Sequence, residues 1–283
     1  MRIAVSAEST VDLTEELIRE FDISVIPYTV ILDNKTVADG EISPQEIFEY
    51  VDKNGILPKT TALNAYEYKE YFESLLKRYD AIIHIALSGE ISSSCSHAVD
   101  AAKGLKEVYI VDSKSLSTGI ALLALYAREL SNTGFSPEEI YKKVQNRVKS
   151  VQASFVIERL DYLFKGGRCN SLQLLGANIL KIRPRITLKD GKMLSDKKYR
   201  GPMWSVVEKY SEDILSEFNT PDLSRAFITY STATPEMVEK AKQALINRGF
   251  KTVYETHAGC TVSSHCGANT LGILYFNDGE ESK

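Results

Sequence analysis

Long apolar runs are missing from this chain of 283 residues, and neither sign of charge dominates it. No stretch approaches the roughly 20 apolar residues that a membrane-spanning helix needs. The short apolar run after Met1 ends at Glu8, which is not the pattern of a signal peptide. A formal net charge of −4 gives no general attraction to nucleic acid or to an anionic membrane. We therefore expect a cytoplasmic protein that binds no nucleic acid and has no integral membrane association.

Cysteine is scarce as well. Four cysteines, at positions 95, 169, 260 and 266, are too few and too scattered for a disulfide framework, so we expect thiols. His257, Cys260, His265 and Cys266 have side chains that can bind zinc, but their spacing matches none of the usual zinc-ligand pairs. Cys260 and Cys266 are therefore predicted to be ordinary buried thiols, and we expect no metal and no cofactor.

The composition that remains, 43% hydrophobic and 25% charged residues, is that of a soluble globular protein. The chain is long enough for two domains that each bury a core. A helix that begins at Ser136-Pro137 ends in the basic, polar stretch 142–150, and the pattern of the sequence changes beyond it. We predict an N-terminal domain over residues 1–150 and a C-terminal domain over residues 151–283.

An apolar strand that runs into a polar turn and then a helix occurs three times, near residues 7, 88 and 112. This repetition predicts a mainly parallel sheet flanked by helices. Strands and helices alternate again beyond residue 150, and Asp190-Gly191 is typical of a β-hairpin turn. The predicted fold is therefore α/β, with two α/β domains.

Local signals place several helices. Ser43-Pro44 followed by Glu46 combines a cap, a proline and a glutamate at the third position, and Asp12 with Glu15 resembles a capping box. Apolar residues at helical spacing predict a further helix with one buried face: Leu172, Leu175, Gly176, Ile179 and Leu180.

The segment 85–98 carries the densest cluster of hydroxyl groups. A buried strand from Ala81 to Leu87 ends here, and Ser92 or Ser93 is predicted to cap a helix that runs to about Lys103. Free N–H groups and hydroxyls at the carboxyl end of a strand favour an anion. A polar cap that binds nothing explains the segment equally well. The G-x-S-x-G turn of a hydrolase nucleophile is absent from it.

Three other points in the sequence carry polar side chains. Thr60 and Thr61 precede a helix rich in aromatic residues and would ordinarily cap it. Arg168 follows a glycine pair that ends a short helix, where an arginine is usually solvated. His265 lies in a loop of small residues, where a single histidine is usually incidental.

Taken together, these residues resemble the DegV family from Arg2 to about Phe276, in order and with similar spacing. The segments that carry the resemblance are Ser9-Thr10 with Asp12-Leu13, Thr60-Thr61, Ser88 with Ser92 to Ser94, Val111-Asp112-Ser113, Tyr162-Leu163 with Lys165 to Arg168, Lys197 to Gly201, and His265 with Gly267 and Gly272. The resemblance implies a two-domain protein that holds one long-chain fatty acid between its domains and is not itself catalytic. Some members present the carboxyl group to a separate fatty-acid kinase, so a kinase is an expected partner.

Carried over to this chain, the family's ligand-binding positions fall on Thr61, Ser92 or Ser93, Arg168, His265 and Gly267. The resemblance implies that Thr61, one of the two serines and His265 contact the carboxylate, while Arg168 orders the head-group site. The chemistry agrees, because a carboxylate held out of water needs neutral donors and one cation.

The acyl chain would need an apolar tunnel. Leu172, Leu175, Ile179 and the aliphatic helix from Ile120 are candidates for its wall. About 0.8 kcal/mol per buried methylene gives on the order of 10 kcal/mol for a dozen methylenes, before the costs of binding. The tail would then dominate affinity.

Two other classes of function stay open. A serine-dependent enzyme acting on a small carboxylate or phosphate would use Ser92 as nucleophile and His265 as base, although no orienting carboxylate can be assigned. A regulatory module that senses lipid is the other.

Overall fold

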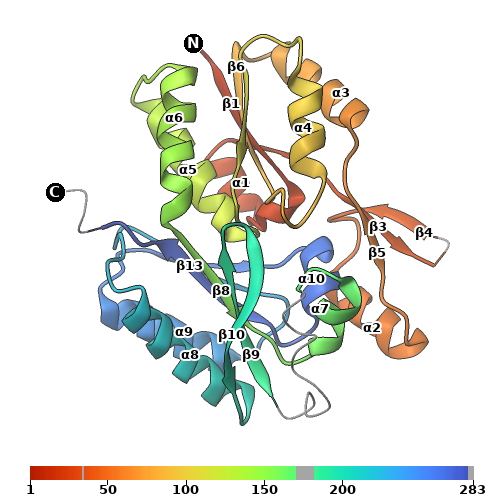
Figure 1. Cartoon of the computed structure of the whole chain (residues 1–283), viewed down its shortest axis with the longest axis vertical. Helices are drawn as coiled ribbons and strands as arrows, with labels where there is room; N and C mark the ends of the chain where they lie inside the picture. The colour runs from red at the N-terminus through yellow and green to blue at the C-terminus, as the bar shows by residue number, and fades with distance from the viewer. Residues whose placement is uncertain (34, 170–181, 280–283) are drawn as a thin grey trace.

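The structure is a computed structural model that describes residues 1–33, 35–169 and 182–279. The predicted helix from Leu172 to Leu180 lies outside the described residues. The fold is α/β and contains a four-stranded, a six-stranded and a three-stranded sheet (Figure 1). In the described part of the chain, no helix is long and apolar enough to cross a membrane.

The four-stranded sheet is parallel throughout, as the repeated strand-turn-helix pattern predicted. Its strands lie in the order β2 (Ile23–Ile26), β1 (Ile3–Glu8), β6 (Ala81–Ala86) and β7 (Val108–Asp112). Every residue of β1 and β6 is buried, because both strands are central and covered on both faces.

Helices cover both faces of the four-stranded sheet. In Figure 1, α5 (Thr118–Asn132) and α6 (Pro137–Arg147) lie on one side of β1 and β6, and α3 (Ala65–Leu76) and α4 (Ser94–Ala102) lie on the other. The short helix α1 (Glu15–Glu20) precedes β2. The 3-10 turns η1 and η2 span Ser9–Val11 and Val148–Ser150.

The six-stranded sheet is formed by the later part of the chain. Its order is β10 (Lys192–Tyr199), β9 (Arg183–Lys189), β8 (Val151–Val156), β13 (Leu271–Phe276), β11 (Ala226–Tyr230) and β12 (Val253–His257). Neighbouring strands are antiparallel except β11 and β12, which are parallel. Helices α8 (Met203–Glu217) and α9 (Pro235–Arg248) pack on one face of this sheet.

Strand β13 shows what lies on each face. Ile273 and Tyr275 pack into the core beneath α8 and α9, whereas Leu274 and Phe276 join the core that contains α5. The alternation follows from the two-residue repeat of a strand. Helix α5 is therefore packed between the two sheets, which explains why it is aliphatic almost all the way round.

The three-stranded sheet joins an early segment of the chain to two late helices. Its strands β4 (Lys35–Ala38), β3 (Thr29–Leu32) and β5 (Lys59–Thr61) are antiparallel. This sheet and α2 (Pro44–Asn54) share a core with α7 (Leu160–Gly166) and α10 (Cys260–Cys266). Side chains such as Phe48 and Tyr162 meet there, with ring centroids 6.2 Å apart.

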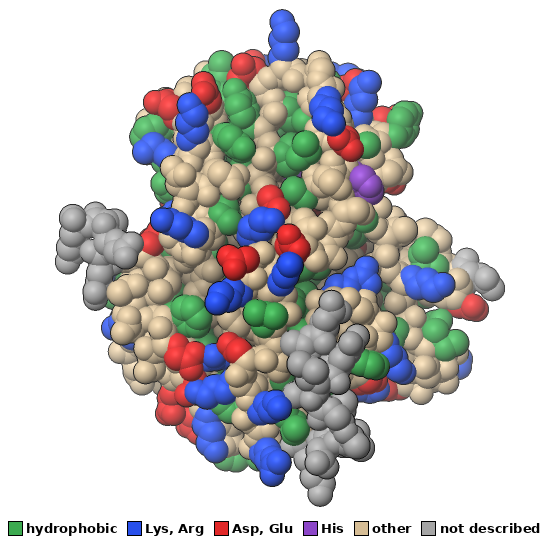
Figure 2. Space-filling view, viewed as in Figure 1, with side chains coloured by type: hydrophobic (Ala, Val, Ile, Leu, Met, Phe, Trp, Pro, Cys, Tyr) green, Lys and Arg blue, Asp and Glu red, His purple; other side chains and the backbone are tan. Residues whose placement is uncertain are grey.

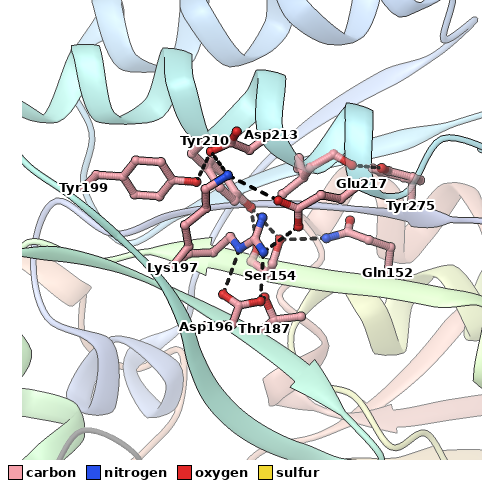
Figure 3. Close-up of polar contacts among 12 residues, drawn as sticks. Gln152, Ser154, Thr187, Asp196, Lys197, Tyr199, Tyr210, Asp213, Glu217 and Tyr275 are labelled. Atoms are coloured by element: carbon pink, nitrogen blue, oxygen red, sulfur yellow. Dashed lines mark hydrogen bonds and ion pairs between the residues drawn. The ribbon is translucent and has the colours of Figure 1, made fainter. Parts of the chain in front are cut away.

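The predicted hairpin at Asp190-Gly191 is present as β9 and β10, and its base is tied to α8 (Figure 3). Arg185 Nη2 lies 2.6 Å from Glu217 Oε2. Lys197 Nζ and Tyr199 Oη each lie 2.7 Å from Asp213 Oδ2. These contacts tie this edge of the six-stranded sheet to α8.

The tip of the hairpin reaches the four-stranded sheet. The hydroxyl of Ser88 donates to the carbonyl of Gly191 at 2.9 Å, and Lys192 Nζ lies 3.5 Å from Glu90 Oε2. Acidic and basic side chains gather together in the middle of the face shown in Figure 2. The hairpin therefore spans from one sheet to the other.

Two predicted helix starts were wrong. Thr14, not Asp12, caps α1, because the turn η1 ends at Asp12, which adopts a left-handed conformation with φ 52°. Asn64, not Thr60 or Thr61, caps α3, because both threonines belong to β5. The capping box at Ser43 is confirmed.

The segment around His265 was also misread as a loop. It forms helix α10, whose first N–H groups are bonded by distant carboxylates: Asp12 Oδ1 accepts from Gly259 N at 2.8 Å, and Asp39 Oδ1 accepts from Cys260 N at 2.7 Å.

Candidate functional site

A cavity of about 220 Å³ lies between the carboxyl ends of the four-stranded sheet and the inner face of the six-stranded sheet. The loops after β1, β6 and β7 contribute Thr10, Leu87 and Leu116 to its wall, and the six-stranded sheet contributes Phe155 and Leu274. The wall is mainly apolar, with hydroxyl groups among the aliphatic side chains. The carboxyl ends of parallel strands are where open α/β sheets bind ligands, and mainly apolar pockets with few polar groups are typical of small-molecule sites.

The structure describes only some of the residues that were predicted to form the wall of an apolar tunnel. Ile120 on α5 is fully buried between the sheets and does not line the cavity, although Leu116 and Ser117 just before that helix do. Leu172, Leu175 and Ile179 lie outside the described residues. The aliphatic sequence of α5 thus reflects packing on two sheets.

The first polar contact in the cavity wall joins Thr60 to His265. Thr60 Oγ1 lies 2.8 Å from His265 Nε2. Successive side chains of a strand point to opposite faces, so Thr60 faces α10 while Thr61 is exposed and donates to the carbonyl of Thr29 at 3.5 Å. The structure therefore places Thr60, and not the predicted Thr61, in the wall.

His265 is electrically neutral at neutral pH. Burial, together with the positive charge of Arg168, lowers the pKa of His265 to about 4. Its Nδ1 has no hydrogen-bond partner among the described residues. A Cβ at Gly166 would lie 2.7 Å from this nitrogen, so only glycine leaves the imidazole room there. The neutral ring can donate a hydrogen bond to an anion without bringing a charge.

Arg168 lines the cavity from the end of α7, where the family resemblance implied a ligand-binding arginine. Gly167 caps the helix with φ 70°, and its N–H donates to the carbonyl of Phe164. The guanidinium of Arg168 turns back to donate to the carbonyl of Gly166. This places a cation on the exposed rim of the cavity, and its planar fork of donors is suited to a carboxylate.

Ser92 and Ser93 both line the cavity at the start of α4. Ser92 Oγ accepts from the N–H of Ser94 at 3.2 Å, while Ser93 occupies the N-cap position without a capping bond from its side chain. The buried hydroxyl of Tyr28 donates to Ser94 Oγ at 2.5 Å and lies 3.2 Å from Ser92 Oγ. Ser93 is therefore the N-cap by position, while the side-chain bond to the first N–H of the helix comes from Ser92.

Gly267 is the one predicted site residue besides Thr61 that does not line the cavity. It follows α10 with φ 76°, and a Cβ there would lie 2.9 Å from the ring of Tyr162. Its carbonyl accepts from the hydroxyl of Ser231 at 2.6 Å. These contacts give Gly267 a role in ending α10 and packing it on α7.

The structure does not assemble a serine nucleophile with a base. The hydroxyl of Ser92 is engaged with Ser94 and Tyr28, and His265 pairs through Nε2 with Thr60. Within the described ranges, no carboxylate bonds His265 Nδ1 to orient the ring. The triad logic of nucleophile, base and orienting acid is therefore not met in this geometry.

Three hydroxyl-bearing residues are among those of the wall that sequence reasoning did not single out. Tyr28 follows the proline that separates β2 from β3, and no local motif marks it. Thr261 lies one helical turn before His265 on α10, a helix that was not predicted. Thr10 belongs to one of the segments that carry the family resemblance, but the sequence did not indicate that it lines a cavity.

The four cysteines are buried thiols, as predicted. Cys260 donates to the carbonyl of Ile42, and burial raises the pKa of both Cys260 and Cys266 to about 12. Over the residues that the structure describes, no group of three or more His, Cys, Asp or Glu side chains could hold a metal ion.

The sheets and the cavity between them define a two-domain α/β protein with a mainly apolar, ligand-sized site. The model of the family described as "Uncharacterised protein, DegV family" matches residues 2–278. The chain therefore belongs to the DegV family, which confirms the resemblance seen in the sequence.

Relatives in this family bind fatty acids. A protein of Thermotoga maritima named "Fatty acid-binding protein" is 28% identical over 285 residues, covering 96% of this chain and 97% of that one. The structure of a DegV family protein from Thermus thermophilus, described as fatty acid binding, is 26% identical and covers 98% of this chain and 99% of that one, with a TM-score of 0.89.

A more distant structure shares the fold. The Fatty Acid Kinase (Fak) B3 protein of Streptococcus pneumoniae, loaded with linoleic acid, is 17% identical and has a TM-score of 0.84. The two chains match over 98% of this chain and 100% of that one.

Proposed function

We propose that this chain binds one long-chain fatty acid in the cavity between the sheets and presents its carboxylate to a separate fatty-acid kinase. The observation that carries the proposal is the polar group formed by Thr60, His265 and Arg168 on an otherwise mainly apolar wall. Fatty-acid binding by DegV relatives supports it.

The head group is assigned by charge and by donors. A carboxylate carries one negative charge and accepts several hydrogen bonds, which Arg168 and the hydroxyls of Ser92 and Ser93 can provide. The pair formed by Thr60 and the neutral His265 provides one more donor, because one of its two polar hydrogens lies in the bond between them. A phosphate carries more negative charge than a carboxylate, and one arginine would not balance it. The chain acts in this proposal as a carrier, and the acyl phosphate is made by the kinase.

The proposal includes the division of the chain. Residues 1–150 contain all strands of the parallel sheet, and residues 151–283 contain all strands of the six-stranded sheet, so we place the ligand between an N-terminal and a C-terminal domain. A kinase that acts on cytoplasmic lipid would meet this carrier in the cytoplasm.

Lipid extraction from the purified protein tests the binding step. Mass spectrometry should identify a bound fatty acid, and adding acids of about 14 to 18 carbons to delipidated protein should raise its melting temperature. Ligand at 100 times its dissociation constant stabilises the folded state by about 2.7 kcal/mol. Absence of lipid together with absence of a thermal shift would refute the carrier function.

A labelling experiment separates the carrier from a serine enzyme. A fluorophosphonate probe should leave Ser92 unmodified, because its hydroxyl contacts Tyr28 and the N–H of Ser94, and no base bonds it among the described residues. Ser92→Ala should still lower lipid retention if that hydroxyl donates to the carboxylate. Covalent modification at Ser92 that is lost in Ser92→Ala would favour the enzyme instead.

A further inference from the structure

Two threonine hydroxyls in the cavity wall have no hydrogen-bond partner among the described residues. Thr10 is 1% exposed and Thr261 is 5% exposed, and both line the cavity. Neither hydroxyl has a partner in the part of the chain that the structure describes. A buried hydroxyl left unpaired costs free energy, so a pair of them on one wall indicates a polar group that comes from outside the protein.

Other hydroxyl groups in the same region donate hydrogen bonds to backbone carbonyls of the protein. On α10, Ser263 donates to the carbonyl of Ala258 at 3.1 Å and Ser264 donates to that of Cys260 at 2.7 Å. Thr270, also in the wall, donates to the carbonyl of Cys266 at 2.9 Å. Thr261 lies at the start of α10 and makes no such bond within the described residues.

The two free hydroxyls belong to elements that are held together. Asp39 Oδ2 accepts from the hydroxyl of Ser9 at 2.9 Å and from the N–H of Thr261 at 3.2 Å, so η1 and the start of α10 share one carboxylate. Asp12, at the end of η1, accepts from Gly259 N at 2.8 Å. Thr10 and Thr261 therefore sit at fixed positions on adjoining elements.

The position of Thr261 relates this second polar point to the proposed head-group site. Thr261 precedes His265 by four residues on α10, and a helix rises about 1.5 Å per residue, so the two lie on one face about 6 Å apart along the axis. That distance spans only a few methylenes of an extended acyl chain. The free hydroxyls therefore lie near the carboxyl-proximal part of a bound chain.

The charges nearby decide what kind of group fits. The carboxylate of Asp39 accepts from the N–H groups of Cys260 and Thr261 and would repel a second anion there. A neutral group that both donates and accepts, such as a hydroxyl, suits two free threonine hydroxyls. We infer that the preferred ligand is a long-chain fatty acid that carries a hydroxyl near its carboxyl end.

This inference rests on the proposed fatty-acid binding and deepens it. The test is competition for delipidated protein between a fluorescent fatty acid and three unlabelled acids of equal length: hexadecanoic, 3-hydroxyhexadecanoic and 16-hydroxyhexadecanoic acid. The 3-hydroxy acid should bind about tenfold tighter than hexadecanoic acid, which corresponds to two modest hydrogen bonds. The 16-hydroxy acid should bind no better than hexadecanoic acid.

Variants locate the effect. Thr10→Val with Thr261→Val should abolish the preference for the 3-hydroxy acid while hexadecanoic acid still binds, and the melting temperature should not fall, because valine replaces an unpaired hydroxyl. Thr270→Val is the matched control, since that hydroxyl is already bonded. It should change the affinity for both acids by the same factor and leave their ratio intact.

The outcomes are distinct. If hexadecanoic acid binds as tightly as the 3-hydroxy acid, the two hydroxyls hold water and the inference is wrong, although fatty-acid binding stands. If the preference survives in the double valine variant, the hydroxyl is recognised elsewhere and the inference is again wrong. If no acid displaces the probe, both the inference and the proposed function fail.

Discussion

Thr60 Oγ1 lies 2.8 Å from His265 Nε2, although 205 positions separate the two residues in the sequence. The contact exists because β5 of the three-stranded sheet packs against α10. The polar group of the cavity is thus assembled by tertiary packing, and neither local segment forms it alone.

Thr60→Val should therefore weaken fatty-acid binding, while Thr61→Val should not. Loss of a hydrogen bond to a charged group costs about 1.5 to 3 kcal/mol, or roughly 10-fold to 150-fold in affinity. Titration of delipidated protein with a fluorescent fatty acid measures both variants. Thr61 is the matched control because it is adjacent, exposed and outside the wall. Equal losses in the two variants would contradict the placement of Thr60.

Arg168 should matter more for acyl transfer than for holding the tail. A fixed cation beside the carboxylate lowers the repulsion when a phosphoryl group arrives. Arg168→Ala and Arg168→Lys should both depress acyl-phosphate formation with a cognate kinase, because lysine lacks the planar fork, while extraction still recovers the fatty acid. Wild-type turnover in both variants would show that Arg168 is only a solvated turn residue.

Asp12 should make the folded state less stable as pH rises. Burial raises the pKa of Asp12 to about 8, although hydrogen bonds from Ser117 and Gly259 oppose the rise. An unfolded aspartate ionises near pH 4, so from about pH 4 to about pH 8 the folded chain holds a proton that the unfolded chain has released. The free energy of unfolding then falls by up to about 1.4 kcal/mol per pH unit.

Asp12→Asn isolates that contribution, because the amide keeps an acceptor for Gly259 and asparagine tolerates the positive φ. Denaturant unfolding at several pH values should give a difference in stability, wild type minus variant, that falls steadily up to about pH 8. A difference that does not change with pH would show that the carboxyl is ionised in the folded protein.

His265 should act in the opposite direction at lower pH. Its pKa of about 4 in the folded chain lies below the ordinary value near 6.5. Below about pH 6.5, His265 of the unfolded chain binds a proton, whereas His265 of the folded chain stays unprotonated down to about pH 4. The stabilisation that is present above pH 6.5 is therefore lost as the pH falls to about 4. His265→Gln should remove this loss in delipidated protein, measured by the same unfolding series. If the stability of the variant fell between pH 6.5 and pH 4 as steeply as that of the wild type, the imidazole of His265 would not be buried and neutral.

Gly191 should tolerate no side chain at the tip of the hairpin. Its φ is +82°, and a Cβ would lie 2.5 Å from Ser88 Oγ and 2.9 Å from Lys114 Cδ. Gly191→Ala should destabilise the fold by more than Gly104→Ala, where φ is +85° and nothing lies within 4 Å. The control carries the backbone strain alone, about 1 to 2 kcal/mol. Equal melting temperatures of the two variants would show that the tip is not held against Ser88.

Much of the fold follows from local patterns. The parallel sheet was predicted because an apolar strand before a polar cap leaves a strong repeated signal, and the hairpin because Asp190-Gly191 fits few other structures. The glycine pair likewise predicted where α7 ends, although only the family resemblance placed Arg168 at the site. These signals lie within a few residues of what they predict.

The rest of the site depends on distant partners. Helix α10 is short and begins with N–H groups bonded by Asp12 and Asp39, so its start has no local cap to read. Whether Thr60 or Thr61 lies in the cavity wall depends on which face of β5 packs against α10. A shift of one residue in the strand register would exchange the two. From the sequence alone, only the family resemblance indicated that His265 lies near Thr60 and Thr61.

The hairpin that links the two sheets also bears on how fast cargo is exchanged. Met193 lines the cavity two residues beyond Gly191, whose carbonyl is bonded to Ser88. In the proposed function, an acyl chain held between the sheets would leave as the hairpin lifts, which breaks that bond. The rate of lipid hand-over should then be set by opening of the protein, a first-order step that does not quicken as more acceptor is supplied, and cutting the Ser88 contact should shorten the residence time of the lipid.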